Sequence, residues 1–383
     1  MQKDRFKKAG DRESLVFIAL LAALILFFSN KMGLANFINT LMNTGYDLLI
    51  NTVLYLMAVA VIIGAFSSLL AEFGVVAVLN KILSPVMKPL YNLPGASVMA
   101  VLLTYLSDNP AVLTLAEDEN FIKYFKKSQV PALTNLGTSF GMGLIISVFM
   151  AGLKGPNGES YMSSVLIGNI GVIIGSIVSV RLMLHFTKNI PENLIDKDID
   201  LENKLNLNLR KVREGSIGSR FINALMDGGK SGVKMGVAII PGVVIICSFV
   251  ILLNSREPAG GYTGAAYEGV ALLPWLGQKL NFILRPLLGF QSDSAISIPI
   301  TALGSAGAAI GLVPKMLAAG ELTGGNIAVF TAMCMCWSGY LSTHIAMMDS
   351  LGCPELSGKA ILSHTVGGLA AGVSAHLIYS LIM

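Results

Sequence analysis

The sequence predicts an all-α polytopic membrane protein with about seven transmembrane helices, two re-entrant hairpins and two interfacial helices, built from two inverted repeats. Composition is the first observation behind this prediction. Hydrophobic residues make up 54% of the 383 residues and charged residues only 13%, whereas about 25% of the residues in soluble domains are charged. The second observation is that stretches of the first half recur, in the same order, in the second half.

The clearest repeated stretch is a hydrophobic segment with a polar interruption. It reads TYLSDNPAVLTLA from Thr104 and TALGSAGAAIGLV from Thr301, and each copy begins fifteen residues after a proline, Pro89 or Pro286. The similarity resumes later, where residues 168–182 parallel residues 363–377. Paired, interrupted hydrophobic segments in corresponding halves are typical of transporters and mark the place where the solute binds.

Seven segments approach or reach the roughly 20 apolar residues that a helix needs to cross a bilayer. They are residues 15–29, 51–71, 131–153, 161–186, 231–253, 326–348 and 359–383. The first has the basic flank and short apolar core of a signal peptide. Because no small-residue cleavage site follows it, we interpret it as an uncleaved anchor.

The basic residues predict the orientation of the chain and its location in the cell (inner or plasma) membrane. The basic N-terminus and the charged linker 187–230 are both expected in the cytoplasm, since lysine and arginine are enriched in cytoplasmic loops. The segments then divide into an anchor helix and loop (1–50), a first repeat (51–186), the cytoplasmic linker (187–230) and a second repeat (231–383). Following the crossings from these points puts the N-terminus inside and the C-terminus outside.

The same count makes residues 96–116 and 292–313 re-entrant hairpins, each preceded by an amphipathic interfacial helix at 75–91 or 271–289. The first hairpin enters from the cytoplasm and the second from outside. The polar tip of the first hairpin carries Asp108 and Pro110. An acid near the bilayer centre costs about 2.5–3.5 kcal/mol on insertion scales. Such backbone is tolerated only where it is buried in protein or lines a cavity.

The two tips and the spans that follow them form the predicted substrate site, because broken helices direct backbone groups and helix ends at a solute. For the small polar residues the alternative is helix packing with modest hydrogen bonds, and for Asp108 it is a helix cap. The predicted substrate-binding residues are Ser107, Asp108, Asn109, Asn135, Thr138, Ser139, Gly304, Ser305, Ser338 and Ser342.

Asp108 and His344 are the candidate ion-coupling groups, with a proton or Na⁺ as the coupling ion. A second interpretation of His344 is that it pairs with Asp349 near the cytoplasmic interface. The C-x-C pair at Cys334 and Cys336 points to different faces of a helix, so no metal site is expected. No cofactor is expected apart from Na⁺ as one of the two coupling ions.

The chain resembles the gate-domain, or "nucleoside recognition", membrane proteins. The likeness lies in the order of elements and in two stretches, LSPVMKPLYNLPGAS from Leu83 and ALGSAGAAIGLV from Ala302. That group includes the spore maturation proteins A and B, the membrane gate of ferrous iron transport protein B, the ethanolamine permease of the eut type and, remotely, the concentrative nucleoside transporters. The glutamate-bearing hairpin motifs of the nucleoside transporters are absent from this chain, in which position 108 is Asp.

The resemblance implies a secondary active transporter, or permease, for a small polar solute, nucleoside-like or an amine. The alternative is a non-transporting structural or biogenesis protein of the spore-maturation type. An enzyme is not expected, because the sequence has no H-E-x-x-H motif or phosphate-binding loop. The expected partners are the solute and membrane lipids, with a homo-oligomer left open. Nucleic acid is not expected, because the basic residues are assigned to loops.

The orientation can be tested with an impermeant thiol reagent on intact cells in a cysteine-free background. A cysteine at Asn206, in the linker, should stay unlabelled until the membrane is permeabilised. Labelling of that cysteine from outside would overturn the predicted orientation.

Overall fold

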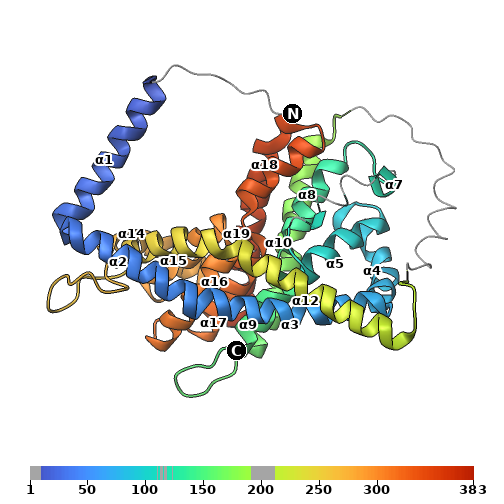
Figure 1. Cartoon of the computed structure of the whole chain (residues 1–383). Helices are drawn as coiled ribbons and strands as arrows, with labels where there is room; N and C mark the ends of the chain where they lie inside the picture. Colours follow the sequence, from blue (N-terminus) through green and yellow to red (C-terminus); the bar gives the residue numbers. More distant parts are fainter. Residues whose placement is uncertain (1–9, 110, 113–114, 116–118, 123, 191–211) are drawn as a thin grey trace.

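The computed structural model describes residues 10–109, 111–112, 115, 119–122, 124–190 and 212–383. Within these residues the regular structure is helical, apart from one β-bridge between Lys154 and Ser160. The predicted fold class, an all-α polytopic membrane protein, is therefore confirmed. Figure 1 shows the helices as one bundle from which α1 projects.

The first half of the chain contains a run of long helices and several short ones. They are α1 (Arg12–Met32), α2 (Leu34–Asp47), the π-helix η1 (Leu48–Val53), α3 (Leu54–Glu72), α4 (Val75–Tyr91), the 3₁₀ turn η2 (Gly95–Ser97), α5 (Val98–Leu106), α7 (Glu119–Ile122), α8 (Val130–Thr138), α9 (Gly143–Gly152) and α10 (Met162–Thr187).

The second half contains a matching run. Its elements are α12 (Ile217–Pro241), the π-helix η3 (Gly242–Cys247), α13 (Ser248–Asn254), α14 (Leu272–Leu288), the 3₁₀ turn η4 (Asp293–Ile296), α15 (Ser297–Gly304), α16 (Ala306–Ala318), α17 (Gly324–Cys336), α18 (Tyr340–Ser350), the 3₁₀ turn η5 (Pro354–Leu356) and α19 (Ser357–Ile382).

Among the described residues, six helical segments are long and apolar enough to cross a membrane, and a bent pair, α4 with η2 and α5, makes a seventh at most. Six of the seven predicted spans correspond to these six segments. The exception is 326–348, which is divided into α17 and α18.

Two of the six segments begin earlier than predicted. Leu34–Glu72 is helical throughout 39 residues, although residues 34–50 were expected to form a loop, and Ile217–Asn254 begins inside the expected linker. At 1.5 Å per residue each extends close to 60 Å, about twice the thickness of the hydrocarbon core. Such helices must tilt or project beyond the membrane, and their polar ends look like loops in a hydropathy pattern.

The two halves share details that the duplicated sequence only hinted at. Helices α4 and α14 each have 17 residues and end at a left-handed residue, Asn92 (φ 55°) or Gly289 (φ 67°). The amide of that residue donates to the carbonyl of Lys88 or Arg285. The last helices, α10 and α19, have 26 residues each.

Corresponding long helices of the two halves pack against each other through glycines. On α3 and α12, Gly64 lies against Gly228, and Gly232 lies against Ala60. A Cβ on any of these three glycines would collide with backbone atoms of the other helix. On α10 and α19, Gly171 and Gly175 lie against Ala371 in the same way. Small residues let helix backbones approach closely in membrane proteins.

In both pairs, residue numbers rise on one helix as they fall on the other, so the paired helices are antiparallel. Gly64 lies beside Gly228, whereas Ala60 lies beside Gly232. Antiparallel pairing of corresponding helices is what a two-fold axis in the membrane plane requires. The pairing supports the predicted inverted repeats.

Figure 1 also shows how the ends of the helices are distributed. The C-terminus lies at the lower edge beside the loop that joins α9 and α10, and α18 lies at the upper edge. The predicted orientation puts the C-terminus and that loop outside and the end of α18 inside. The two groups of segments therefore lie on opposite sides of the bundle, as the prediction requires.

The α3–α12 contact predicts unequal effects for two neighbouring glycines of α12. Gly232→Ala should lower the melting temperature of the purified protein by more than about 3 °C, because its Cβ would meet the backbone of Ala60 and Val61. Gly229→Ala is the matched control, since its Cβ would lie 3.7 Å from a methyl of Val61 and alanine is the better helix former. Equal melting temperatures for the two variants would contradict the close packing.

Candidate functional site

The first hairpin is interrupted at its predicted tip, residues 107–109. Helix α5 ends at Leu106, and Ser107 has φ −136° and ψ −113°, outside helical geometry. The half-buried Asp108 accepts a hydrogen bond on its carboxylate from the amide of Asn109 (2.7 Å), and its carbonyl accepts one from the amide of Ala111 (2.9 Å). The acid therefore lies at the start of the returning segment, as the cap interpretation expected.

The second tip, residues 304–306, is better defined. Ser305 is extended (φ −162°, ψ 118°) between α15 and α16, and its hydroxyl accepts from the amide of Ala308 (3.2 Å) as an N-cap. The same residue lies against Gly242 on the long α12–η3 segment, where a Cβ would come within 2.8 Å of its hydroxyl. Ser305 therefore caps its helix and contacts the long helix at once.

The spans after the two hairpins are both broken near their middle. The first break, residues 139–142, separates α8 from α9 and ends at Met142 with φ 53°. The second break, residues 337–339, separates α17 from α18 and ends at Gly339 with φ 61°. The left-handed region is uncommon for a residue with a side chain, so the bend at Met142 is held by its surroundings.

These four interruptions meet. The buried amide of Asn109, at the first tip, donates to the carbonyl of Ser338 in the second break. A Cβ on Gly141, in the first break, would collide with both of these residues. The amide of Gly339 donates to the carbonyl of Ala302, one turn before the second tip (3.2 Å).

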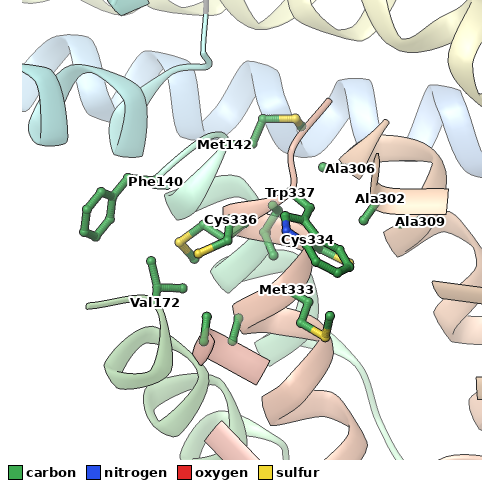
Figure 2. Packing of buried hydrophobic residues seen from close by; sticks show 14 of the residues in the cluster. Phe140, Met142, Val172, Ala302, Ala306, Ala309, Met333, Cys334, Cys336 and Trp337 are labelled. Atoms are coloured by element: carbon green, nitrogen blue, oxygen red, sulfur yellow. The ribbon is translucent and has the colours of Figure 1, made fainter. Parts of the chain in front are cut away.

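Figure 2 shows the apolar side of this meeting point. Trp337 of the second break lies in the same part of the view as Met142 of the first break, Ala306 of the second tip and Ala302 just before that tip. The first and the last interruption are more than 200 residues apart in the sequence. All four nevertheless form one region of the bundle.

Several predicted site residues lie in this region and others do not. Ser107, Asp108, Asn109, Gly304, Ser305 and Ser338 belong to the two tips and the second break. By contrast, Asn135 donates to Ser179 and to the carbonyl of Ala360, both 3.0 Å away. Ser139 begins the first break, but its hydroxyl and that of Thr138 donate to carbonyls of α8 at 2.7 Å. The side chain of Ser342 lies outside the described residues.

The side chain of His344 is fully buried, whereas Asp349 is exposed, so the two residues lie in different surroundings. The ring Nδ1–H donates to the carbonyl of Tyr340 (2.9 Å), because a carbonyl can only accept. Its Nε2 is then the acceptor atom and faces the hydroxyl oxygen of Thr138 at 3.5 Å.

The sequence analysis missed His364, whose ring lies 4.6 Å from that of His344. Its Nε2–H donates to the carbonyl of Cys336 (2.5 Å), the last residue of α17, and its Nδ1 accepts from Ser179 (3.0 Å). Ser179 in turn accepts from Asn135. His364 thereby satisfies a carbonyl at the second break, and no spacing in the sequence connects it with that carbonyl.

Two side-chain polar atoms of the region are buried without a hydrogen-bond partner among the described residues, the Oδ1 of Asn109 and the indole Nε1 of Trp337. An unpaired buried donor or acceptor costs about 1–3 kcal/mol and usually has an explanation, such as a bound solute, ion or water. Both atoms are candidate contact points for a ligand, and the Asn109 Oδ1 also lies against Gly141, where an added Cβ would come within 2.1 Å of it.

The fold is that of a concentrative nucleoside transporter. The structure is similar to CNTnw in an inward-facing substrate-bound state, with a TM-score of 0.52 and 15% identity over 98% of this chain and 87% of that chain. It is also similar to a doubly substituted CNTnw in an outward-facing state, with a TM-score of 0.50 and 15% identity over 97% and 88%. A scan of protein-family models and a search of curated proteins gave no match.

The likeness confirms, for the fold alone, the predicted remote resemblance to concentrative nucleoside transporters. The resemblance to the spore maturation proteins and to the other gate-domain groups stays a prediction.

The position of His364 makes a prediction about stability. His364→Leu should lower the melting temperature by several degrees, since the Cys336 carbonyl loses its donor and the Ser179 hydroxyl proton loses its acceptor, at about 1–3 kcal/mol for a buried group left unpaired. His185→Leu is the control, because His185 is exposed near the end of α10. A variant as stable as the control would show that His364 does not hold the second break.

Proposed function

We propose that this protein is a secondary active transporter that carries a small polar solute through the region where the two tips meet, driven by a proton or Na⁺ gradient. The observation that carries the proposal is the convergence of four helix interruptions from both halves of the chain. In transporters built from inverted repeats, broken helices from both repeats supply the site near the bilayer midplane.

The chemistry of the tips suits a solute that forms hydrogen bonds. The unpaired Oδ1 of Asn109 can accept a hydrogen bond, and the hydroxyls of Ser107 and Ser305 can donate one. Nucleosides and small amines both carry N–H donors for such an acceptor. The inward-facing CNTnw with its substrate bound adds an associational argument for a nucleoside-like solute.

Asp108 and His344 remain the proposed ion-coupling groups. Asp108 is half-buried beside Asn109, where a carboxylate could hold Na⁺ or a proton. His344 offers Nε2 to the Thr138 oxygen, whose own proton is already donated to the Thr134 carbonyl. A proton on Nε2 would convert this contact of two acceptors into a hydrogen bond.

Uptake into proteoliposomes tests the proposal. Vesicles that contain the purified protein should accumulate a labelled nucleoside or amine when a proton or Na⁺ gradient is imposed, and should lose the accumulated solute when the gradient is dissipated. Failure of every nucleoside and small amine under both gradients would favour the structural alternative of the spore-maturation type.

The variant Asp108→Asn distinguishes an ion-coupling role of Asp108 from a role as a helix cap. The amide retains the size of the side chain and an acceptor for the Asn109 amide but removes the charge. We expect the variant to fold and to lose at least about tenfold of its ion-driven uptake, because coupling needs the ionisable group.

Asp349→Asn is the matched control, since Asp349 is exposed. Its uptake should equal that of the wild type. Normal ion-driven uptake by Asp108→Asn would show that Asp108 only caps the returning segment.

A further inference from the structure

A cavity of about 970 Å³ lies away from the tips, between the long segment α2–η1–α3, helix α13, loop 255–271 and helix α16. The predicted orientation puts this loop on the external side. The lining combines aromatic walls with charged groups, which is the usual character of a site for a small molecule. The aromatic members are Tyr55, Phe149 and Tyr267.

Tyr267 is held rigidly in this wall. Its backbone lies in the left-handed region (φ 69°), and its amide donates to the hydroxyl of Thr44 on α2 (2.9 Å). Its own hydroxyl donates to the carboxylate of Asp47. Burial and the neighbouring Asp47 raise the pKa of the phenol, which therefore stays protonated and keeps donating.

The next residue fastens the loop further. The buried Glu268 carboxylate accepts from the amides of Thr263 (3.0 Å) and Gly264 (3.0 Å) and from the hydroxyl of Thr40 on α2 (3.4 Å). Burial would raise its pKa, but these hydrogen bonds outweigh burial and hold the pKa below its usual value. Strained backbone that persists because its surroundings fix it is typical of ligand clamps.

An ammonium group already lies on this wall. The Nζ of Lys315, which comes from α16, lies over the face of the Tyr267 ring. Aromatic faces attract cations, and do so more strongly where water is excluded. The phenol beneath this ammonium is hydrogen-bonded to Asp47, which also accepts from the side-chain amide of Asn51 (2.7 Å).

The charges of the lining also favour a cation. Apart from Lys315 it carries three carboxylates, Asp47, Asp293 and Glu321, and one guanidinium, Arg256. Without the lysine ammonium the cavity would hold two more negative than positive groups. A cation from solution would replace the positive charge that Lys315 now supplies.

We propose that Asp47 and the ring of Tyr267 form an external ammonium-binding subsite, which Lys315 fills in this conformation and a solute with an alkylammonium group can fill in its place. Lys315 then acts as a built-in competitor. Its displacement would free α16, the returning arm of the second hairpin, from the loop. The subsite does not depend on the proposed transport through the tips.

The test measures binding to the full-length protein in detergent by the shift in melting temperature. The probe is ethylammonium chloride, with ethanol at the same concentration and sodium chloride at the same ionic strength as controls. Lys315→Met should bind ethylammonium at least tenfold more tightly than the wild type, because the competitor is gone. Lys279→Met, an exposed lysine of α14, should bind as the wild type does.

Further variants assign the subsite. Adding Asp47→Asn or Tyr267→Leu to Lys315→Met should abolish the gain, whereas Lys315→Arg should show none because the cation is retained. If Lys315→Met does not fold, Lys315→Gln serves in its place. Equal affinities of the wild type and both neutral variants, or an equal response to ethanol, would overturn the proposal.

Discussion

Interrupted helices inside a membrane must have their freed backbone groups satisfied by other parts of the protein, because lipid offers no hydrogen bonds. The described residues contain four such interruptions; hydrogen bonds join three of them, and the fourth, residues 139–142, packs against two of these through Gly141. The first tip donates through Asn109 to the carbonyl of Ser338 in the second break, and the amide of Gly339 donates to the arm of the second hairpin. Moving the first tip, the second break or the second hairpin would leave buried polar groups unpaired, and the close contact at Gly141 keeps the first break beside them.

The long helices supply the frame in which these interruptions can meet. The α3–α12 and α10–α19 pairs approach through glycines, where an added Cβ would strike the opposite backbone. This closeness depends on packing rather than on hydrophobic burial, since lipid tails are as apolar as the side chains. The α10–α19 pair also carries Ser179 and His364, which connect the frame to the end of α17.

Beside the cavity at loop 255–271, polar groups of two segments likewise satisfy one another through hydrogen bonds. Residues 36, 40, 43 and 47 of α2 recur every three or four positions and so share one face of the helix, with residue 44 beside them four positions after residue 40. Each of them hydrogen-bonds to loop 255–271, and the Asp47 contact also positions the ring beneath the Lys315 ammonium. A row of polar residues that would be costly in lipid is thus matched by a loop of the other half.

The sequence by itself determined the all-helical membrane class and most of the long apolar segments, and it predicted the hairpins and repeats, because hydropathy and duplication can be read along the chain. It did not determine the helical state of residues 34–50, whose polar face is satisfied only by a loop some 220 residues away. It also left two interpretations of His344 open and did not single out His364. Their partners, Thr138 and the Cys336 carbonyl, come from elements that only tertiary packing brings together.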